Sequence, residues 1–273
     1  MFSVIHDDNS TQIDYTQDAK SFIKDTFSTT LIAAEDYLYV GLYKPFERFY
    51  CDFETANTNA NDLDVEFWNG STWTNVSNLV DDTKGFTRSG FVSFDKNTDL
   101  WETLASIGGV TRYWLRIKPD ADHSATTFNG IGIVFSDDDD LKEEFWEISS
   151  FLPTGESSFI AKHQSARNDI VQEIRNRGSF KKASGQQSQH ITEFDFINPV
   201  EEIKQASKYL ALHKIFNNIS DDTEGKLFQL SEYYKEKFKS AFSIYFLSLD
   251  VDDDGKNDTV EVLNVRRVKV NRV

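Results

Sequence analysis

The sequence is poor in the residues that mark secreted and membrane proteins. Among its 273 residues there is one cysteine, Cys51, which excludes an internal disulfide and fits a reducing compartment. No stretch approaches the roughly 18–20 apolar residues of a membrane-spanning helix, and the first residues lack the basic and apolar segments of a secretory signal. These absences predict a protein that is made in a cytoplasm and does not enter a membrane.

Positive charge is also scarce. The 29 Lys and Arg residues are outnumbered by 45 Asp and Glu residues, which gives a formal net charge of -16. Because binding to the phosphate backbone needs clustered Lys and Arg, this balance argues against a protein that wraps nucleic acid. An acidic wall beside DNA is compatible with it, since such a wall repels the duplex and lets it slide past.

The sequence also lacks a recognisable catalytic constellation. Its five histidines are scattered without the spacing of zinc ligands: His6, His123, His163, His190 and His213. No nucleophile is paired with a base, and no glycine-rich phosphate loop lies between a strand and a helix. We therefore expect that the protein is not an enzyme. His163 and His213 fall on apolar helix faces, where we expect polar contacts in the core or between helices.

The first half is rich in apolar and aromatic segments of strand length, separated by turn residues. These segments are residues 37–43, 49–53, 64–68, 72–76, 90–94, 112–118 and 128–135. The dipeptide Asn69-Gly70 is the strongest short signal of a hairpin. The spacing predicts an antiparallel β-sandwich over residues 1–138, with one short helix at residues 98–107.

After residue 138 the apolar period becomes helical. Helices are predicted at residues 141–152, 159–174, 199–216 and 223–242, followed by two strands around an acidic turn. Residues 139–273 are thus expected to form a small helical bundle closed by a C-terminal β-hairpin, which makes the whole chain α+β with two domains. The four aspartates at 137–140 are interpreted as a helix start or a solvated linker, with a metal cluster as the alternative.

The acidic turn near the C-terminus has the spacing of a calcium loop. Asp250, Asp252, Asp254, Asp258 and Glu261 stand where EF-hand loops place oxygen ligands, and Gly255 stands where those loops bend. The flanks are strand-like rather than helical, so the alternative is a solvated hairpin tip without metal. No other cofactor is expected.

Basic residues gather in two places that we interpret as partner-binding segments. Lys181 and Lys182 lie in a long polar segment, residues 179–192, of the kind that is often functional. After Glu261 every charged residue is positive: Arg266, Arg267, Lys269 and Arg272. These residues either protect an exposed edge strand or dock on an acidic neighbour.

Two tryptophans flank the Asn69-Gly70 hairpin. Together with Trp101, Trp114 and several tyrosines, Trp68 and Trp73 are candidates for a sugar-stacking platform on the sandwich, and the alternative is that these residues are part of its packing.

The second half resembles the head-to-tail connector proteins of tailed bacteriophages, also called adaptor or head-completion proteins. The segments that carry the resemblance are residues 167–175, residues 206–213, residues 247–258 and Arg266-Arg267. The first half, with residues 67–73, 89–94 and 113–116, looks like a β-sandwich module that recurs in phage structural proteins. The small adaptors consist of little more than the bundle, so the large first domain is a departure that leaves the position in neck or tail open.

The resemblance implies a structural protein of the virion that is assembled in the host cytoplasm. Its copies would form a ring, commonly of twelve, between the portal protein and a tail-completion or neck protein. Packaged DNA would pass through the channel without sequence-specific binding, and the sandwich would decorate the outside. The alternative function is a glycan-binding tail or decoration protein that uses Trp68 and Trp73.

Overall fold

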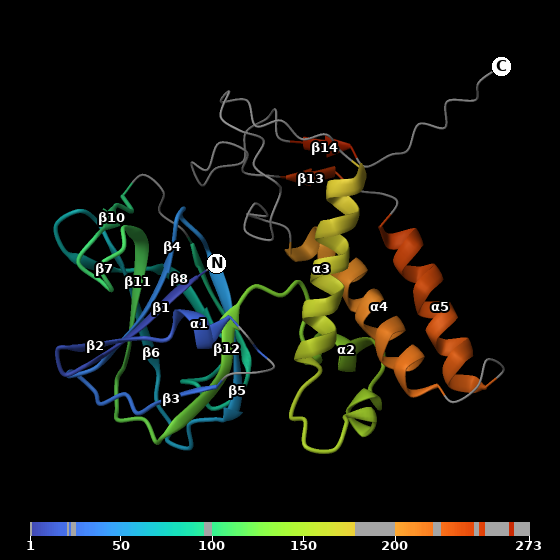
Figure 1. The fold of residues 1–273 in the computed structure, drawn as a ribbon, viewed down its shortest axis with the longest axis horizontal. Helices are drawn as coiled ribbons and strands as arrows, with labels where there is room; N and C mark the ends of the chain where they lie inside the picture. The colour runs from blue at the N-terminus through green and yellow to red at the C-terminus, as the bar shows by residue number, and fades with distance from the viewer. Residues whose placement is uncertain are drawn as a thin grey trace. The chain divides into compact units, whose positions relative to one another are not determined.

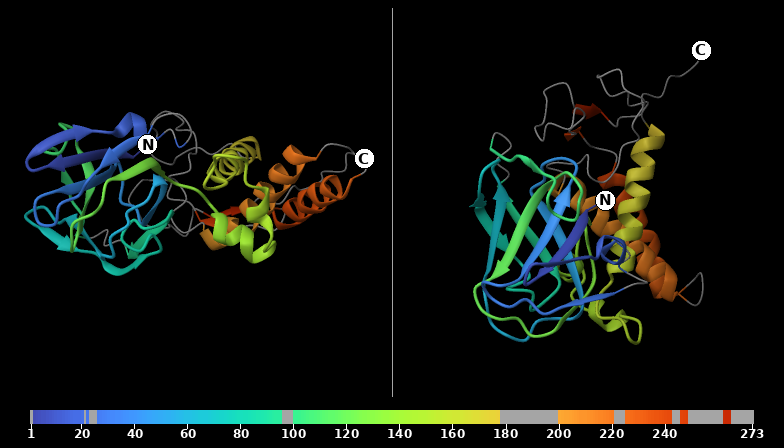
Figure 2. Two further views of the ribbon diagram at one scale, coloured as in Figure 1. Left: turned by 90° about the horizontal axis from the view of Figure 1, so that it is seen from below. Right: turned by 60° about the vertical axis from the view of Figure 1, so that its left-hand side comes forward.

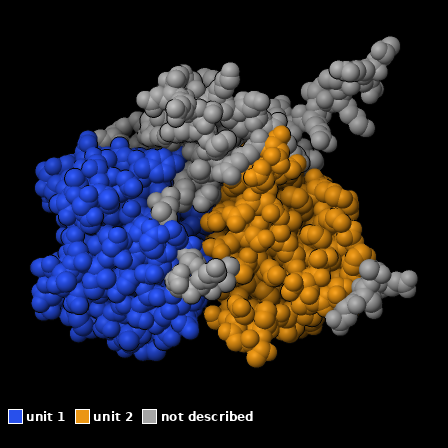
Figure 3. Space-filling model, in the orientation of Figure 1, with its two compact units in different colours: residues 1–133, 253–255 blue, residues 134–252, 256–273 orange. Residues whose placement is uncertain are grey.

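The computed structural model describes residues 2–20, 22, 26–95, 100–177, 200–220, 225–242, 246–248 and 262–264. Over these residues the chain is α+β, with two large antiparallel sheets followed by helices (Figure 1). It divides into two compact units (Figure 3). Unit 1 contains the described residues up to Ile133, and unit 2 contains those from Val134 onward. The sequence analysis placed the boundary after residue 138.

Unit 1 consists of two antiparallel sheets and one short helix, α1 (Thr16–Ala19). The larger sheet has the order β2-β1-β4-β11-β6-β7, and β10 pairs with β11. Its strands are β1 (Ser3–Asp8), β2 (Thr11–Asp14), β4 (Tyr37–Leu42), β6 (Leu63–Trp68), β7 (Trp73–Asn75), β10 (Thr103–Leu104) and β11 (Arg112–Pro119). The smaller sheet has the order β3-β12-β5-β9-β8. Its strands are β3 (Phe27–Thr29), β5 (Arg48–Thr55), β8 (Ser77–Asp81), β9 (Gly90–Asp95) and β12 (Thr126–Gly132).

The core of unit 1 is filled by the inward residues of both sheets, an arrangement consistent with the predicted sandwich (Figure 2). Leu38 and Val40 on β4 are fully buried, as are Leu115 and Ile117 on β11. On the smaller sheet, the ring of Phe128 contacts three neighbours, with centroid distances of 4.8 Å to Phe27, 4.7 Å to Phe53 and 5.4 Å to Phe86. Each such side chain stabilises the fold by about 1.5–3 kcal/mol when it leaves water.

Each strand that was predicted in the first half falls on a strand, and β6 pairs with β7 around the predicted Asn69-Gly70 hairpin. The predicted helix at 98–107 is wrong over its described residues, 100–107, which contain β10 and turns instead. Trp101, Leu104 and Ile107 have helical spacing but do not pack on one face. Trp101 packs in the core against Phe67 of the larger sheet and Phe94 of the smaller sheet, whereas Leu104 and Ile107 pack with Trp114. The indole of Trp101 donates a hydrogen bond to the Trp114 carbonyl (3.2 Å), and that of Trp114 donates to the Leu104 carbonyl (3.0 Å).

Unit 2 is helical. Its elements are α2 (Asp138–Glu144), a 3-10 turn η1 (Ile148–Phe151), α3 (Ile160–Arg177), α4 (Val200–Ile219), α5 (Lys226–Ala241), β13 (Phe246–Ser248) and β14 (Val262–Asn264). Helix α4 packs against both α3 and α5, and β13 pairs antiparallel with β14. The predicted helix at 141–152 is broken into α2 and η1. No helix among the described residues is long and apolar enough to cross a membrane.

One buried histidine makes the stability of unit 1 depend on pH. The side chain of His123 is almost fully buried and its ring lies 5.5 Å from that of Phe86, edge to face. Neither ring nitrogen has a hydrogen-bond partner in the described part of the chain. Burial lowers the pKa of His123 to about 4, so the folded unit keeps this imidazole neutral.

We therefore expect unit 1 to lose stability as the pH falls from about 6.5 to about 4, because in this window the unfolded chain binds a proton that the folded chain does not. The loss from His123 is up to about 3 kcal/mol. The free energy of unfolding is measured by urea titration at several pH values, with tryptophan fluorescence as the signal. In His123→Phe this free energy should change less steeply with pH. His6, whose pKa burial also lowers, is present in both proteins, so the difference isolates His123. Equal slopes would contradict this account.

Candidate functional site

The outward face of the larger sheet carries the aromatic and charged residues of unit 1. Strand pairing places Arg116 opposite Tyr39 on one side and opposite Glu66 on the other. In the same way, Trp68 is opposite Trp73. Directly paired residues of an antiparallel sheet point to the same face, so these five side chains share the outer face.

One half of this outer face is covered by the chain itself. Ile5, Tyr39 and Trp114 are buried there beneath Ile107, which comes from the segment between β10 and β11. Gly41 permits this arrangement, because a Cβ at that position would overlap the indole ring of Trp114. The covered half is therefore part of the structural core.

The other half remains partly open and is the candidate site. We call it the outer patch and define it as Tyr37, Glu66, Trp68, Trp73, Arg116 and Lys118. Tyr37 and Trp73 pack against the covered half and stay partly exposed. The rings of Trp68 and Trp73 meet edge to face with centroids 5.6 Å apart.

Arg116 lies at the centre of the outer patch. Its guanidinium carbon is 4.7 Å from the ring centroid of Tyr37 and 4.8 Å from that of Trp73. Its Nε and Nη2 atoms each lie 2.7 Å from Oε2 of Glu66. The side chain of Arg116 is 19% exposed and that of Glu66 is 10% exposed, so this ion pair is shielded from water. The two rings and the carboxylate hold the guanidinium in one place.

The remaining charges of the patch are also paired. Nζ of Lys118 lies 3.6 Å from Oε1 of Glu66 and 3.6 Å from Oδ2 of Asp64. Burial raises the pKa of Tyr39 to about 12, and the nearby Asp7 adds to this increase. The Tyr39 hydroxyl is therefore neutral at physiological pH. The patch offers ring faces and fixed polar groups, which suit it to binding a ligand.

Of the four tryptophans predicted for a sugar-stacking platform, the structure brings Trp68 and Trp73 together on this face. The prediction is wrong for Trp101 and Trp114, which are buried and part of the packing. It missed Arg116, Glu66 and Tyr37. Alternation along residues 112–118 was a usable signal, since it places residues 114, 116 and 118 on one face of a strand.

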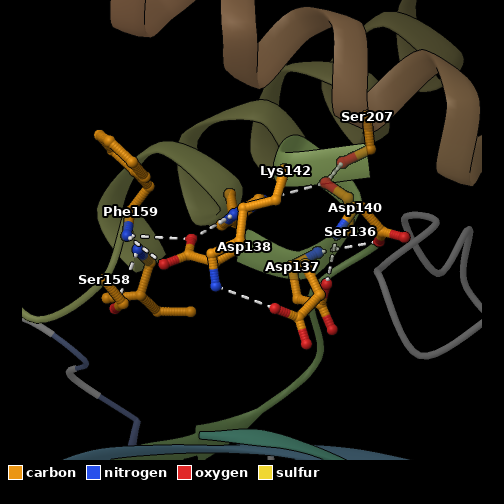
Figure 4. A network of polar contacts seen from close by, with 11 residues as sticks. Ser136, Asp137, Asp138, Asp140, Lys142, Ser158, Phe159 and Ser207 are labelled. Carbon is orange, nitrogen blue, oxygen red and sulfur yellow. Dashed lines mark hydrogen bonds and ion pairs between the residues drawn. The ribbon is translucent and has the colours of Figure 1, made fainter. Parts of the chain in front are cut away.

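In unit 2, the aspartates at 137–140 form a polar network at the start of α2 (Figure 4). Oδ1 of Asp137 accepts a hydrogen bond from the Asp140 N–H (3.0 Å), and Oδ2 of Asp140 accepts one from the Asp137 N–H (3.1 Å). Oδ1 of Asp140 also lies 2.7 Å from Nζ of Lys204 on α4. Asp140 is only 6% exposed. The prediction of a helix start is confirmed, whereas a solvated linker is wrong for Asp140.

Asp138 connects this network to α3. Its carboxylate accepts a hydrogen bond from the Phe159 N–H (3.1 Å) and lies 3.0 Å from Nε2 of His163. Nδ1 of His163 is 3.0 Å from Oγ of Ser136, which is 2.8 Å from Oγ of Ser207 on α4. Ser136, His163 and Ser207 are fully buried, so their chain of hydrogen bonds joins helices and is closed to a substrate.

The predicted polar contacts of His163 and His213 are confirmed: His163 is buried in the core, and His213 is half-buried and makes its contact between helices. Nδ1 of His213 on α4 lies 2.9 Å from Oγ of Ser231 on α5. Each histidine thus links helix α4 to another element of unit 2, His213 directly and His163 through Ser136 and Ser207.

Replacing His163 with alanine should lower the free energy of unfolding of unit 2 by about 1–3 kcal/mol or more, because Asp138 and Ser136 each lose a buried hydrogen-bond partner. The measurement is urea unfolding followed by helical circular dichroism. Lys142→Ala is the control, since the exposed pair Lys142–Asp139 should contribute only about 0.2–1 kcal/mol. Equal effects of the two substitutions would show that the buried network is energetically unimportant.

The other predicted site residues lie outside the described residues. These are Asp250, Asp252, Asp254, Asp258 and Glu261 for calcium, and Lys181, Lys182, Arg266, Arg267, Lys269 and Arg272 for partners. Among the residues that the structure does describe, no cluster of three or more His, Cys, Asp or Glu side chains is arranged to hold a metal ion.

No protein-family model matches the chain, and no curated protein matches it. Among solved structures, it is similar to a chitosan-binding module of a chitosanase/glucanase from Paenibacillus sp. IK-5, at 13% identity over 40% of this chain and 76% of that one, with a TM-score of 0.26. The CBM32 module of AlyQ, in complex with 4,5-unsaturated mannuronic acid, matches at 9% identity with the same coverage and TM-score.

A family 89 glycoside hydrolase from Clostridium perfringens matches at 10% identity over 64% of this chain and 19% of its own length, with a TM-score of 0.30. With TM-scores of at most 0.30, these likenesses assign neither a fold nor a ligand to this chain.

Proposed function

We propose that unit 1 binds carbohydrate through the outer patch. The observation that carries this proposal is the placement of two partly exposed tryptophans, Trp68 and Trp73, beside the ion pair of Arg116 and Glu66. Sugar rings present apolar C–H faces that stack on aromatic rings, while their hydroxyls bond to fixed charged groups. The patch supplies both kinds of contact on one face.

The rigidity of the patch also favours a binding role. Tyr37, Glu66, Trp68, Arg116 and Lys118 stand on strands whose other face is buried in the core, and Trp73 packs against Arg116, so these side chains lose little freedom when a ligand docks. Glu66, the carboxylate of the patch, is held by Arg116 and Lys118. The proposal is therefore one of recognition.

Trp73→Ala should weaken binding to a responsive glycan at least tenfold, because it removes a stacking surface and a support of Arg116. Binding is measured on a glycan array and then by calorimetry on the best ligand. The control is Trp146→Ala, which removes an exposed tryptophan of unit 2 and should leave glycan affinity unchanged. An array without signal for the folded wild-type chain would overturn the proposal.

A second candidate function is the structural adaptor of a phage neck, with a ring of copies between portal and tail-completion protein. Unit 2 supplies a specific observation in its favour. Trp146 is 80% exposed and Tyr233 is 52% exposed. Tryptophan and tyrosine are enriched at the centres of protein interfaces, so their exposure favours a binding role for these two side chains. On this proposal they contact neighbouring copies or assembly partners.

If unit 2 assembles through Trp146, the wild-type chain should form rings and Trp146→Ala should shift them toward monomers, because the interface loses one anchor. Mass photometry and electron microscopy, with and without portal protein, measure this. Trp73→Ala serves as the reciprocal control and should assemble normally. A wild-type chain that stays monomeric and ignores portal protein would overturn the adaptor function.

A further inference from the structure

We propose that the outer patch selects glycans that carry no acidic groups, because both of its cations are already neutralised within the sheet. This inference rests on the proposed carbohydrate-binding function and specifies the class of ligand.

Arg116 is the first of the two cations. Its Nε and Nη2 atoms are both directed to Oε2 of Glu66 at 2.7 Å, and both side chains are largely shielded from solvent. A carboxylate or sulfate on a ligand would have to compete with Glu66 for the same donors. It would also meet the negative charge of Glu66 in a poorly hydrated place, where charges are weakly screened.

Lys118 is the second cation. Its ammonium group lies 3.6 Å from both Glu66 and Asp64. These two carboxylates and Asp7, which pairs with Tyr37 across the strands, outnumber Arg116 and Lys118 by three charges to two. Near the hairpin and β10, Glu102 and Arg112 add one charge of each sign. The face has no excess positive charge to offer an anion.

The net charge of the whole chain also disfavours anionic ligands. This formal net charge of -16 repels an approaching polyanion at low ionic strength. A neutral oligosaccharide experiences no such repulsion, and its contacts with ring faces and paired groups depend little on salt. The patch should therefore combine neutral-glycan binding with rejection of uronic-acid and sulfated polymers.

The experiment compares the wild-type full chain on neutral polymers (xylan, galactan and mixed-linkage glucan), on chitosan, and on anionic polygalacturonate and alginate, at low and at high salt. We expect a neutral polymer to bind with less than a twofold salt effect, and the anionic polymers to bind at least tenfold more weakly at low salt. If the chain bound chitosan, which is cationic, more tightly than every neutral polymer, the assignment of neutral glycans as the ligand class would be overturned.

Glu66→Gln tests the cause. It keeps the shape of the side chain and releases the charge of Arg116, so polygalacturonate binding should rise at least fivefold at low salt and fall again at high salt. Glu54→Gln is the matched control, since it makes the same charge change at an exposed position on β5 of the smaller sheet. If polygalacturonate binding rose equally in both variants, the cause would be net charge, and the proposed role of the Arg116–Glu66 pair would be overturned.

The outcomes separate the two proposals. Wild-type binding to polygalacturonate as tight as to neutral polymers, still lost in Trp73→Ala, would overturn the selectivity and leave carbohydrate binding intact. A folded wild-type chain that binds none of the polymers would overturn both. If Glu66→Gln does not fold, as judged by urea unfolding, the wild-type panel alone decides the selectivity.

Discussion

The register in which β11 pairs with β4 and β6 determines both faces of the larger sheet. Leu115 and Ile117 point into the core, so Trp114 and Arg116 must point out. Because the side-chain period of a strand is two, a slip by one residue would bury the guanidinium and expose the apolar residues. Burial of the inner face therefore fixes the positions of the outer patch, and no loop has to fold for its central residues to be in place.

In unit 2, buried polar groups join the helices in addition to aromatic packing. The segment before α2 meets α3 and α4 at three buried polar residues: Ser136, His163 and Ser207. These side chains form hydrogen bonds with one another and with Asp138. The net gain from each bond is only about 0.5–1.5 kcal/mol, but an unpaired group in the same place is costly. Such a network thus specifies one arrangement of the helices more than it adds to their stability.

The sequence predicted the elements well where apolar runs are bounded by turn residues and less well where tertiary contacts override local spacing. Apolar and aromatic runs of strand length located β4, β5, β6, β9 and β11, and the Asn-Gly turn located the hairpin between β6 and β7. Residues 101, 104 and 107 have the three-residue spacing of a helix, but Trp101 enters the core and Leu104 and Ile107 pack with Trp114. Trp68 and Trp73 were found from local sequence, but the pairing of Arg116 with Glu66 spans 50 residues and follows only from strand order.

The pair of Arg116 and Glu66 has two effects that cannot be separated. Fixed by the carboxylate and by the rings of Tyr37 and Trp73, the guanidinium loses little conformational freedom when a ligand arrives. The same carboxylate cancels the charge that would attract an anion from a distance. Affinity at this surface must therefore come from short-range contacts: stacking on ring faces and hydrogen bonds to groups held in fixed positions. On the proposed function, a ligand that is neutral, planar on one side and rich in hydroxyls meets these conditions, whereas a polyanionic glycan adds charges that the patch does not attract.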